Sequence, residues 1–134
     1  MFVSLVIASY DPASRSLCIV NCGHPEPVVV RNCNRVETVK ASAAPIGLTE
    51  PLGATLSEVQ LEPGDAVCFY TDGLIEAANA GQEMFGQPRL EWTLRSAAGR
   101  PLDDVADALI AEVEAFHGGR GLEDDLTLVM MRQG

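Results

Sequence analysis

Acidic side chains stand at the ends of two apolar runs of the sequence. Asp72 follows residues 66–71 (AVCFYT), and Asp124 and Asp125 directly precede residues 126–131 (LTLVMM). If the two runs form neighbouring antiparallel strands, the end of the first lies beside the start of the second, and the carboxylates come together. A carboxylate held at the end of a core strand loses hydration, and a cation or a hydrogen-bond donor must compensate that loss.

These carboxylates predict a site for a hard divalent cation such as Mg²⁺ or Mn²⁺, because such cations prefer oxygen ligands. The alternative is structural. In that interpretation Asp72 is an ordinary turn residue in ThrAspGly, and Asp124 and Asp125 belong to an acidic loop. The spacing alone leaves both interpretations open.

His24, in the sequence NCGHPEP, is a second candidate for chemistry. A histidine with an ordinary pKa of about 6.5 can protonate a leaving serine oxygen or contact a phosphate group. The alternative is a histidine that hydrogen-bonds the backbone of a turn. Gly23 and Gly47 would permit a close approach of the backbone near such a site.

The composition excludes several classes of protein. The chain has 134 residues, of which 47% are hydrophobic and 21% charged, as expected for one globular domain rather than a disordered chain. Its formal net charge of −10 repels nucleic-acid phosphates and anionic lipid headgroups, so we expect neither nucleic-acid nor membrane binding. No apolar run reaches the roughly 18 to 20 residues of a membrane span, and we expect a cytoplasmic protein.

Four cysteines are present: Cys18, Cys22, Cys33 and Cys68. They form no CxxC pair, and the chain has only two histidines to complete a zinc shell, so no zinc site is expected. Cys18 and Cys68 lie within apolar runs. They are expected to be reduced and to pack as small hydrophobic residues.

The first half of the chain has the pattern of short strands. Residues 2–10 and 16–21 flank an AspPro turn and predict a hairpin, while 28–31 and 36–40 flank AsnCysAsn. The first 40 residues are therefore predicted to form an antiparallel meander. Residues 41–54 contain two prolines and two glycines without a sustained period, which indicates a structured loop that crosses from one sheet to another.

The second half mixes strands and helices. Residues 55–61 alternate like an exposed strand, and 66–70 are apolar on both faces like a central strand. Helices are predicted from about residue 87 to 97 and from Pro101 to the GlyGly at 118–119, before a last buried strand at 126–131. The predicted fold is α+β, an antiparallel β-sandwich with helices packed on the sheet.

Five segments occur in a recognisable order: MFVSLVIASYD, VNCGHPEPVVV, AAPIGL, LEPGDAVCFYTDGLIEAANAGQEMFG and GLEDDLTLVMMR. Together they resemble the PPM-type metal-dependent serine/threonine phosphatases, in their bacterial SpoIIE/RsbU-like branch. VNCGHPEPVVV carries the Asn-x-Gly-His-x-Pro pattern of that branch. The segments cover nearly the whole chain, so the resemblance implies the PPM sandwich fold throughout.

The resemblance also implies roles for individual residues. Asp72 of YTDG and Asp124 of the AspAsp-x-Thr motif would be ligands of a pair of Mn²⁺ or Mg²⁺ ions, with the backbone of Gly73 beside them. Asp125 stands where many relatives have asparagine, so it would either support a ligand or be one. The metals would activate a bridging water to attack a phosphoserine or phosphothreonine. The implied substrate is a phosphorylated STAS-type anti-sigma-factor antagonist.

The chain departs from the family at its start. The phosphatase domain normally has further residues before the MFVSL strand, including a Gly-Asp-x-x-Asp element whose first aspartate bridges both metals. We therefore expect residues 1–134 to be a single domain that forms the C-terminal portion of the phosphatase fold, truncated at the N-terminus.

Three expectations follow from this departure. The chain should bind one metal ion or none, because Asp72 and Asp124 supply too few oxygens for a pair. It should have little activity alone, restored by the N-terminal half in trans. It should also form a homodimer or larger assembly to cover exposed apolar faces. The alternative function is a noncatalytic binding or regulatory module with a degenerate phosphatase fold.

Overall fold

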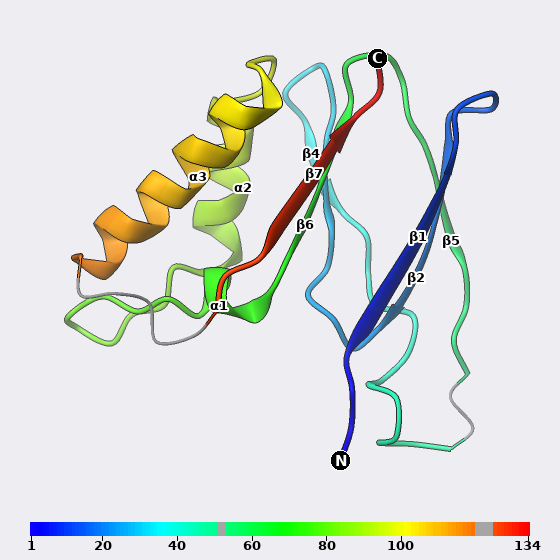
Figure 1. The fold of residues 1–134 in the computed structure, drawn as a ribbon, viewed down its shortest axis with the longest axis horizontal. Helices are drawn as coiled ribbons and strands as arrows, with labels where there is room; N and C mark the ends of the chain where they lie inside the picture. The colour runs from blue at the N-terminus through cyan, green and yellow to red at the C-terminus, as the bar shows by residue number, and fades with distance from the viewer. Residues whose placement is uncertain (51–52, 120–124) are drawn as a thin grey trace.

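The structure, a computed structural model, describes residues 1–50, 53–119 and 125–134. Its elements form two antiparallel sheets, ordered β1-β2-β5 and β4-β3-β6-β7, together with helices (Figure 1). In chain order the elements are β1 (Leu5–Asp11), β2 (Ser16–Cys22), β3 (Val28–Val30), β4 (Val36–Thr38), β5 (Ser57–Gln60), β6 (Ala66–Tyr70), α1 (Asp72–Ile75), α2 (Gly86–Ser96), α3 (Leu102–His117) and β7 (Leu128–Arg132). The predicted antiparallel sandwich with helices on a sheet is confirmed.

The two sheets and the helices form three layers. In Figure 1, α2 and α3 lie on the side of β4-β3-β6-β7 that faces away from β1-β2-β5. Successive side chains of a strand point to opposite faces. Val28 and Val30 therefore pack in the cluster under the helices, while Val29 packs between the sheets. β6 alternates in the same way, because Cys68 joins the first cluster and Val67 the second.

The helices pack against the sheet through buried side chains that recur at helical spacing. Val105, Leu109 and Val113 recur every four residues on α3, and all three are buried. Leu90 and Leu94 of α2 are fully buried in the same cluster. None of the described helices has both the length and the apolarity that a membrane span requires.

An ion-pair network fixes the sheet at the end opposite to α1. Asp65 is only 2% exposed, and its carboxylate accepts a hydrogen bond from Arg31 Nη1 at 2.8 Å. It also accepts the backbone N–H groups of Asn32 and Glu62, both at 2.9 Å. Burial alone would raise the pKa of the Asp65 carboxyl, but these donors together hold that pKa below its ordinary value.

The predicted meander over the first 40 residues is wrong. β1 and β2 form one hairpin and β3 and β4 another, but β2 and β3 belong to different sheets. The chain already changes sheets between Cys22 and Val28, where Pro25 and Pro27 cannot donate the backbone hydrogen bonds that a continued ladder would need. The crossing predicted over residues 41–54 is confirmed, because β4 and β5 lie in different sheets.

The last strand also differs from the prediction of a buried strand. β7 has β6 as its one strand neighbour among the described residues, and Val129 is 57% exposed. An apolar run does not reveal whether a strand has one neighbour or two. The short helix α1 was not predicted, because four residues are too few to show a helical period.

Candidate functional site

The predicted metal site lies where β6 ends and β7 begins. The backbone N–H of Thr71 donates to the carbonyl of Thr127 at 3.1 Å, and the Thr127 N–H donates to the Thr71 hydroxyl at 2.9 Å. This link continues the antiparallel pairing of Tyr70 with Leu128. Because Asp72 follows one end of the link and Asp125 lies two residues before the other, the structure brings the two acidic segments to one end of the sheet.

Asp72 is the first residue of α1 and is exposed to solvent. The next two residues, Gly73 and Leu74, are buried and anchor the turn beneath it. Two backbone bonds define this turn: Leu74 N–H donates to the Thr71 carbonyl at 3.1 Å, and Glu76 N–H donates to the Asp72 carbonyl at 2.9 Å. The backbone of Asp72 is thus held by core packing, while the residue itself remains accessible.

The other predicted ligands are only partly described. Asp125 is exposed at the start of the described segment that leads into β7, and Asp124 lies outside the described residues. Within residues 1–50, 53–119 and 125–134, no cluster of three or more His, Cys, Asp or Glu side chains could hold a metal ion. The carboxylates of Asp72 and Asp125 fit a hard cation in kind, but two groups are fewer than the about six oxygen ligands that Mg²⁺ takes.

His24 lies on the segment that crosses between the sheets, just before β3. β3 pairs antiparallel with β6, with Val28 opposite Cys68, so residues that precede β3 lie at the same end of the sheet as residues that follow β6. His24 and Asp72 therefore share one end of the sheet. The Nδ1 atom of His24 is buried and has no hydrogen-bond partner in the described part of the chain.

Asn21 enters the sequence-based predictions only as the first residue of the Asn-x-Gly-His-x-Pro pattern, with no role of its own; it is 1% exposed at the end of β2. Its side-chain oxygen accepts the His24 N–H at 2.9 Å, and its side-chain nitrogen donates to the His24 carbonyl at 3.0 Å. The available signal was an asparagine in the alternating apolar positions of a strand, where a polar side chain must find partners.

Two buried groups under the site are structural. Burial raises the pKa of the Cys68 thiol to about 12, which excludes it as a nucleophile near neutral pH. Burial likewise raises the pKa of Tyr70 to about 12, and its hydroxyl donates to Gln87 Oε1 at 2.6 Å. Tyr70 thus ties the end of β6 to the first turn of α2.

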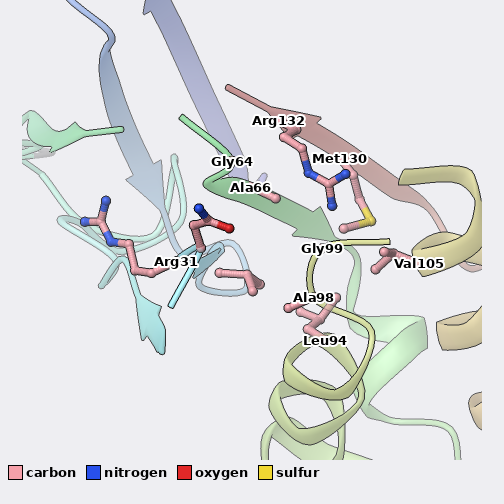
Figure 2. Close-up of a pocket in the computed structure, with 11 residues that line it drawn as sticks. Arg31, Gly64, Ala66, Leu94, Ala98, Gly99, Val105, Met130 and Arg132 are labelled. Carbon is pink, nitrogen blue, oxygen red and sulfur yellow. The ribbon is translucent and has the colours of Figure 1, made fainter. Parts of the chain in front are cut away.

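A cavity between the sheet and the α2–α3 connection lies at the other end of the molecule (Figure 2). It is lined at the start of β6 by Ala66, at the end of β7 by Arg132 and beyond α2 by Gly99. Its accessible volume of about 10 Å³ is room for about one water molecule. It is too small for a phosphorylated side chain and does not compete with the Asp72 end as a substrate site.

Comparisons with known proteins agree with the fold. Protein IcfG of Synechocystis sp. (strain ATCC 27184 / PCC 6803 / Kazusa) is 29% identical over 133 residues, which cover 96% of this chain and 20% of that protein. The SiaA-PP2C domain of Pseudomonas aeruginosa superposes with a TM-score of 0.86 at 25% identity, over 96% of this chain and 51% of that chain.

The phosphatase domain of the cell fate determinant SpoIIE from Bacillus subtilis, in a structure described as Mn presoaked, superposes with a TM-score of 0.76 at 22% identity. That match covers 96% of this chain and 56% of the other. The chain thus spans about half the length of these solved domains and a fifth of IcfG.

The match to a family model decides the family. The model described as Stage II sporulation protein E (SpoIIE) matches residues 1–134, which is the whole chain. The fold agrees with this match, because the two antiparallel sheets and the helices superpose on phosphatase domains of the PP2C type. The chain therefore belongs to the SpoIIE family of PP2C-type serine/threonine phosphatase domains.

Proposed function

We propose that the junction of β6 and β7 is part of the active site of a metal-dependent phosphoserine/phosphothreonine protein phosphatase. The observation that carries this proposal is the Thr71–Thr127 link, which brings Asp72 and the segment that begins at Asp125 to one end of the sheet. Family membership and the manganese-soaked structure of the SpoIIE phosphatase domain support it.

Asp72 and Asp124 would hold Mn²⁺ or Mg²⁺, with Asp125 as a ligand or as support for one, and with the backbone of Gly73 alongside. When bound there, a divalent metal would supply a water of lowered pKa as the nucleophile for phosphorus. This chain's own residues provide the rest. Gly73 and Leu74 fix the backbone that carries Asp72, and His24 would contact the phosphate or give a proton to the departing serine oxygen.

For the substrate we propose a phosphorylated STAS-type anti-sigma-factor antagonist in the cytoplasm. Support comes from the resemblance of the whole chain to the SpoIIE/RsbU-like branch and from its match to the SpoIIE family model. A rival substrate class would be an unrelated phosphoprotein. The two are separated by comparing phosphate release from a phosphorylated STAS domain with release from a phosphoserine peptide of the same sequence as its phosphorylation site.

The function is tested by Mn²⁺-dependent phosphate release from the phosphoprotein. It is measured with the chain alone and with the chain mixed with the half of the SiaA phosphatase domain that this chain does not match. We expect little turnover from the chain alone and restored turnover from the mixture. Asp72→Asn should reduce the restored rate by at least roughly 10- to 100-fold, because that is already the cost of losing a residue that only hydrogen-bonds a metal ligand.

Asp103→Asn, on the exposed first turn of α3, is the matched control and should leave the rate unchanged. If the mixture binds the phosphoprotein but Asp72→Asn and the wild type release phosphate equally slowly, the phosphatase proposal is wrong. The noncatalytic binding module then becomes the better account.

We also propose that the chain self-associates through the outer face of β1. Met1–Tyr10 contains no charged side chain in a protein of net charge −10. Ile7 of β1 and Val3, two residues before β1, point to the same face of the strand. Val3 is 55% exposed and Ile7 is 58% exposed. An edge strand with such a face is a ready template for pairing with a second copy.

Sedimentation velocity at tens of micromolar tests the assembly. We expect a species of at least twice 14.3 kDa that dissociates in the variant Ile7→Glu. Val129→Glu is the matched control, because Val129 is also 57% exposed but lies on the edge strand of the other sheet. A compact monomer in the wild type would refute self-association without affecting the phosphatase proposal.

A further inference from the structure

His24 sits on a segment whose backbone hydrogen-bonds to one buried side chain, that of Asn21. The segment leaves β2 at Cys22 and enters β3 at Val28, so it connects two sheets without belonging to either ladder. Asn21 precedes it and faces the space between the sheets, since its strand neighbours Leu17 and Ile19 pack in the intersheet cluster. The amide of Asn21 is therefore buried directly beneath the crossing segment.

The hydrogen bonds of Asn21 match the chemistry of an amide. Its oxygen accepts the N–H of His24 at 2.9 Å, while its nitrogen donates to the carbonyls of His24 at 3.0 Å and Pro25 at 3.5 Å. A side chain here must both accept and donate. Aspartate could only accept when ionised, alanine could do neither, and glutamine would add a methylene group to a packed interior.

The backbone of Asn21 also hydrogen-bonds to a second segment, residues 42–43. Its carbonyl accepts the N–H groups of Ser42 at 3.0 Å and Ala43 at 3.2 Å. The two segments touch at Gly23, which has φ +70°, because a Cβ there would lie 2.4 Å from the Pro45 ring. Residues 21–25 and 42–45 thus form one fastened unit, here called the Asn21 clamp.

The two histidines of the chain are held in different ways. His117 Nδ1 lies 2.7 Å from the carbonyl of Ala78 and is anchored by its own ring. His24 Nδ1 is buried without a hydrogen-bond partner in the described residues, and two hydrogen bonds join the His24 backbone to the side chain of Asn21. A buried polar atom without a partner costs free energy, and the surrounding structure must impose its position.

We propose that Asn21 is a positioning residue for His24: the Asn21 clamp holds the imidazole at the end of the sheet where Asp72 begins α1. The proposal rests on the proposed phosphatase function, in which the phosphate group is bound at that end. It assigns no chemistry to Asn21, which acts only through the segment that carries His24. Its consequence is that the position of the His24 ring depends on Asn21 while the site at Asp72 does not.

The test uses the uniformly ¹⁵N-labelled chain, whose imidazole and backbone amide signals are observed by NMR with and without Mn²⁺. In the wild type, we expect ring signals of His24 that differ from those of an unstructured histidine and that broaden when Mn²⁺ is added. In Asn21→Ala, the His24 ring signals should move to unstructured values and lose at least half of the Mn²⁺ broadening. The His117 signals and the Mn²⁺ broadening of the Gly73 amide should stay as in the wild type.

Two further variants keep the proposal falsifiable if Asn21→Ala unfolds. In Gly23→Ala, the added Cβ collides with Pro45 and should push residues 21–25 away from residues 42–45. The His24 ring signals should then change as they do in Asn21→Ala. Asn79→Ala is the matched control. Asn79 also clamps a turn, through its side-chain oxygen and the N–H groups of Gly81 and Glu83, but in a different loop.

The outcomes separate this inference from the proposed function. If His24 keeps its ring signals in both Asn21→Ala and Gly23→Ala, the positioning role is overturned. If Mn²⁺ broadens neither Gly73 nor His24 in the wild type, the metal site of the proposed function fails. The metal-free ring signals of the variants still decide whether Asn21 positions His24.

Discussion

The two sheets differ in what covers their outer faces. The sheet β4-β3-β6-β7 lies beneath α2 and α3, which bury Leu90, Leu94 and Leu109 against it. The outer face of β1-β2-β5 has no helix over it among the described residues, and Ile7 remains 58% exposed there. The predicted site lies at the end of the sheet that the helices cover, while the outer face of β1 stays exposed to solvent.

The largest expected contrast is in stability. Leu109→Ala removes a fully buried side chain between α3 and the covered sheet and should lower the free energy of unfolding by about 2 to 5 kcal/mol. Ile7→Ala on the bare sheet should change it by no more than about 0.5 kcal/mol. Urea unfolding at a concentration where the chain is monomeric measures both. Equal losses would show that the outer face of β1 is covered in solution.

Asp65→Asn should have the next largest effect. It breaks the pair with Arg31 at a position that is 2% exposed, and loss of one partner of a buried pair costs about 3 kcal/mol. Glu83→Gln is the matched control, since it breaks the exposed pair with Arg89 and should change the unfolding midpoint far less. If both variants unfold at the same urea concentration, the Arg31–Asp65 pair does not stabilise the covered sheet.

A smaller effect concerns pH. The pKa of Asp65 is lower in the folded chain than its ordinary value of about 3.9, so the unfolded state binds more protons as the pH falls. The stabilisation by Asp65 is therefore complete above about pH 5 and is lost as the pH falls through the folded-state pKa. The difference in unfolding midpoint between wild type and Asp65→Asn should shrink from pH 6 to pH 3. A difference that grows on acidification would contradict the direction of the pKa shift.

The same contrast explains how much could be predicted from the sequence. Strands with a clear pattern were found at their observed places, as for residues 66–70, and the helix predicted at about 87–97 is observed at Gly86–Ser96. Assignment to sheets was not predictable over the first 40 residues, because alternation shows which face of a strand is apolar but not which strand it pairs with. The prolines at 25 and 27 were the available signal for the change of sheet.

The candidate site was predictable in outline only. Placement of Asp72 after a central strand followed from the apolar run before it, and pairing of β6 with β7 is observed. The role of Asn21 was missed because it depends on contacts with His24 and Pro25 that arise only when the chain crosses between the sheets. Asp124 lies outside the described residues, so its place beside Asp72 stays a prediction.

The most direct test of the central claim is titration of Mn²⁺ into the ¹⁵N-labelled chain. If the β6–β7 junction is the metal site, the amide signals of Thr71, Gly73 and Thr127 should broaden first, and Asp72→Asn should abolish this broadening while Asp103→Asn leaves it intact. Broadening that begins at the acidic first turn of α3, or that persists unchanged in Asp72→Asn, would contradict the account.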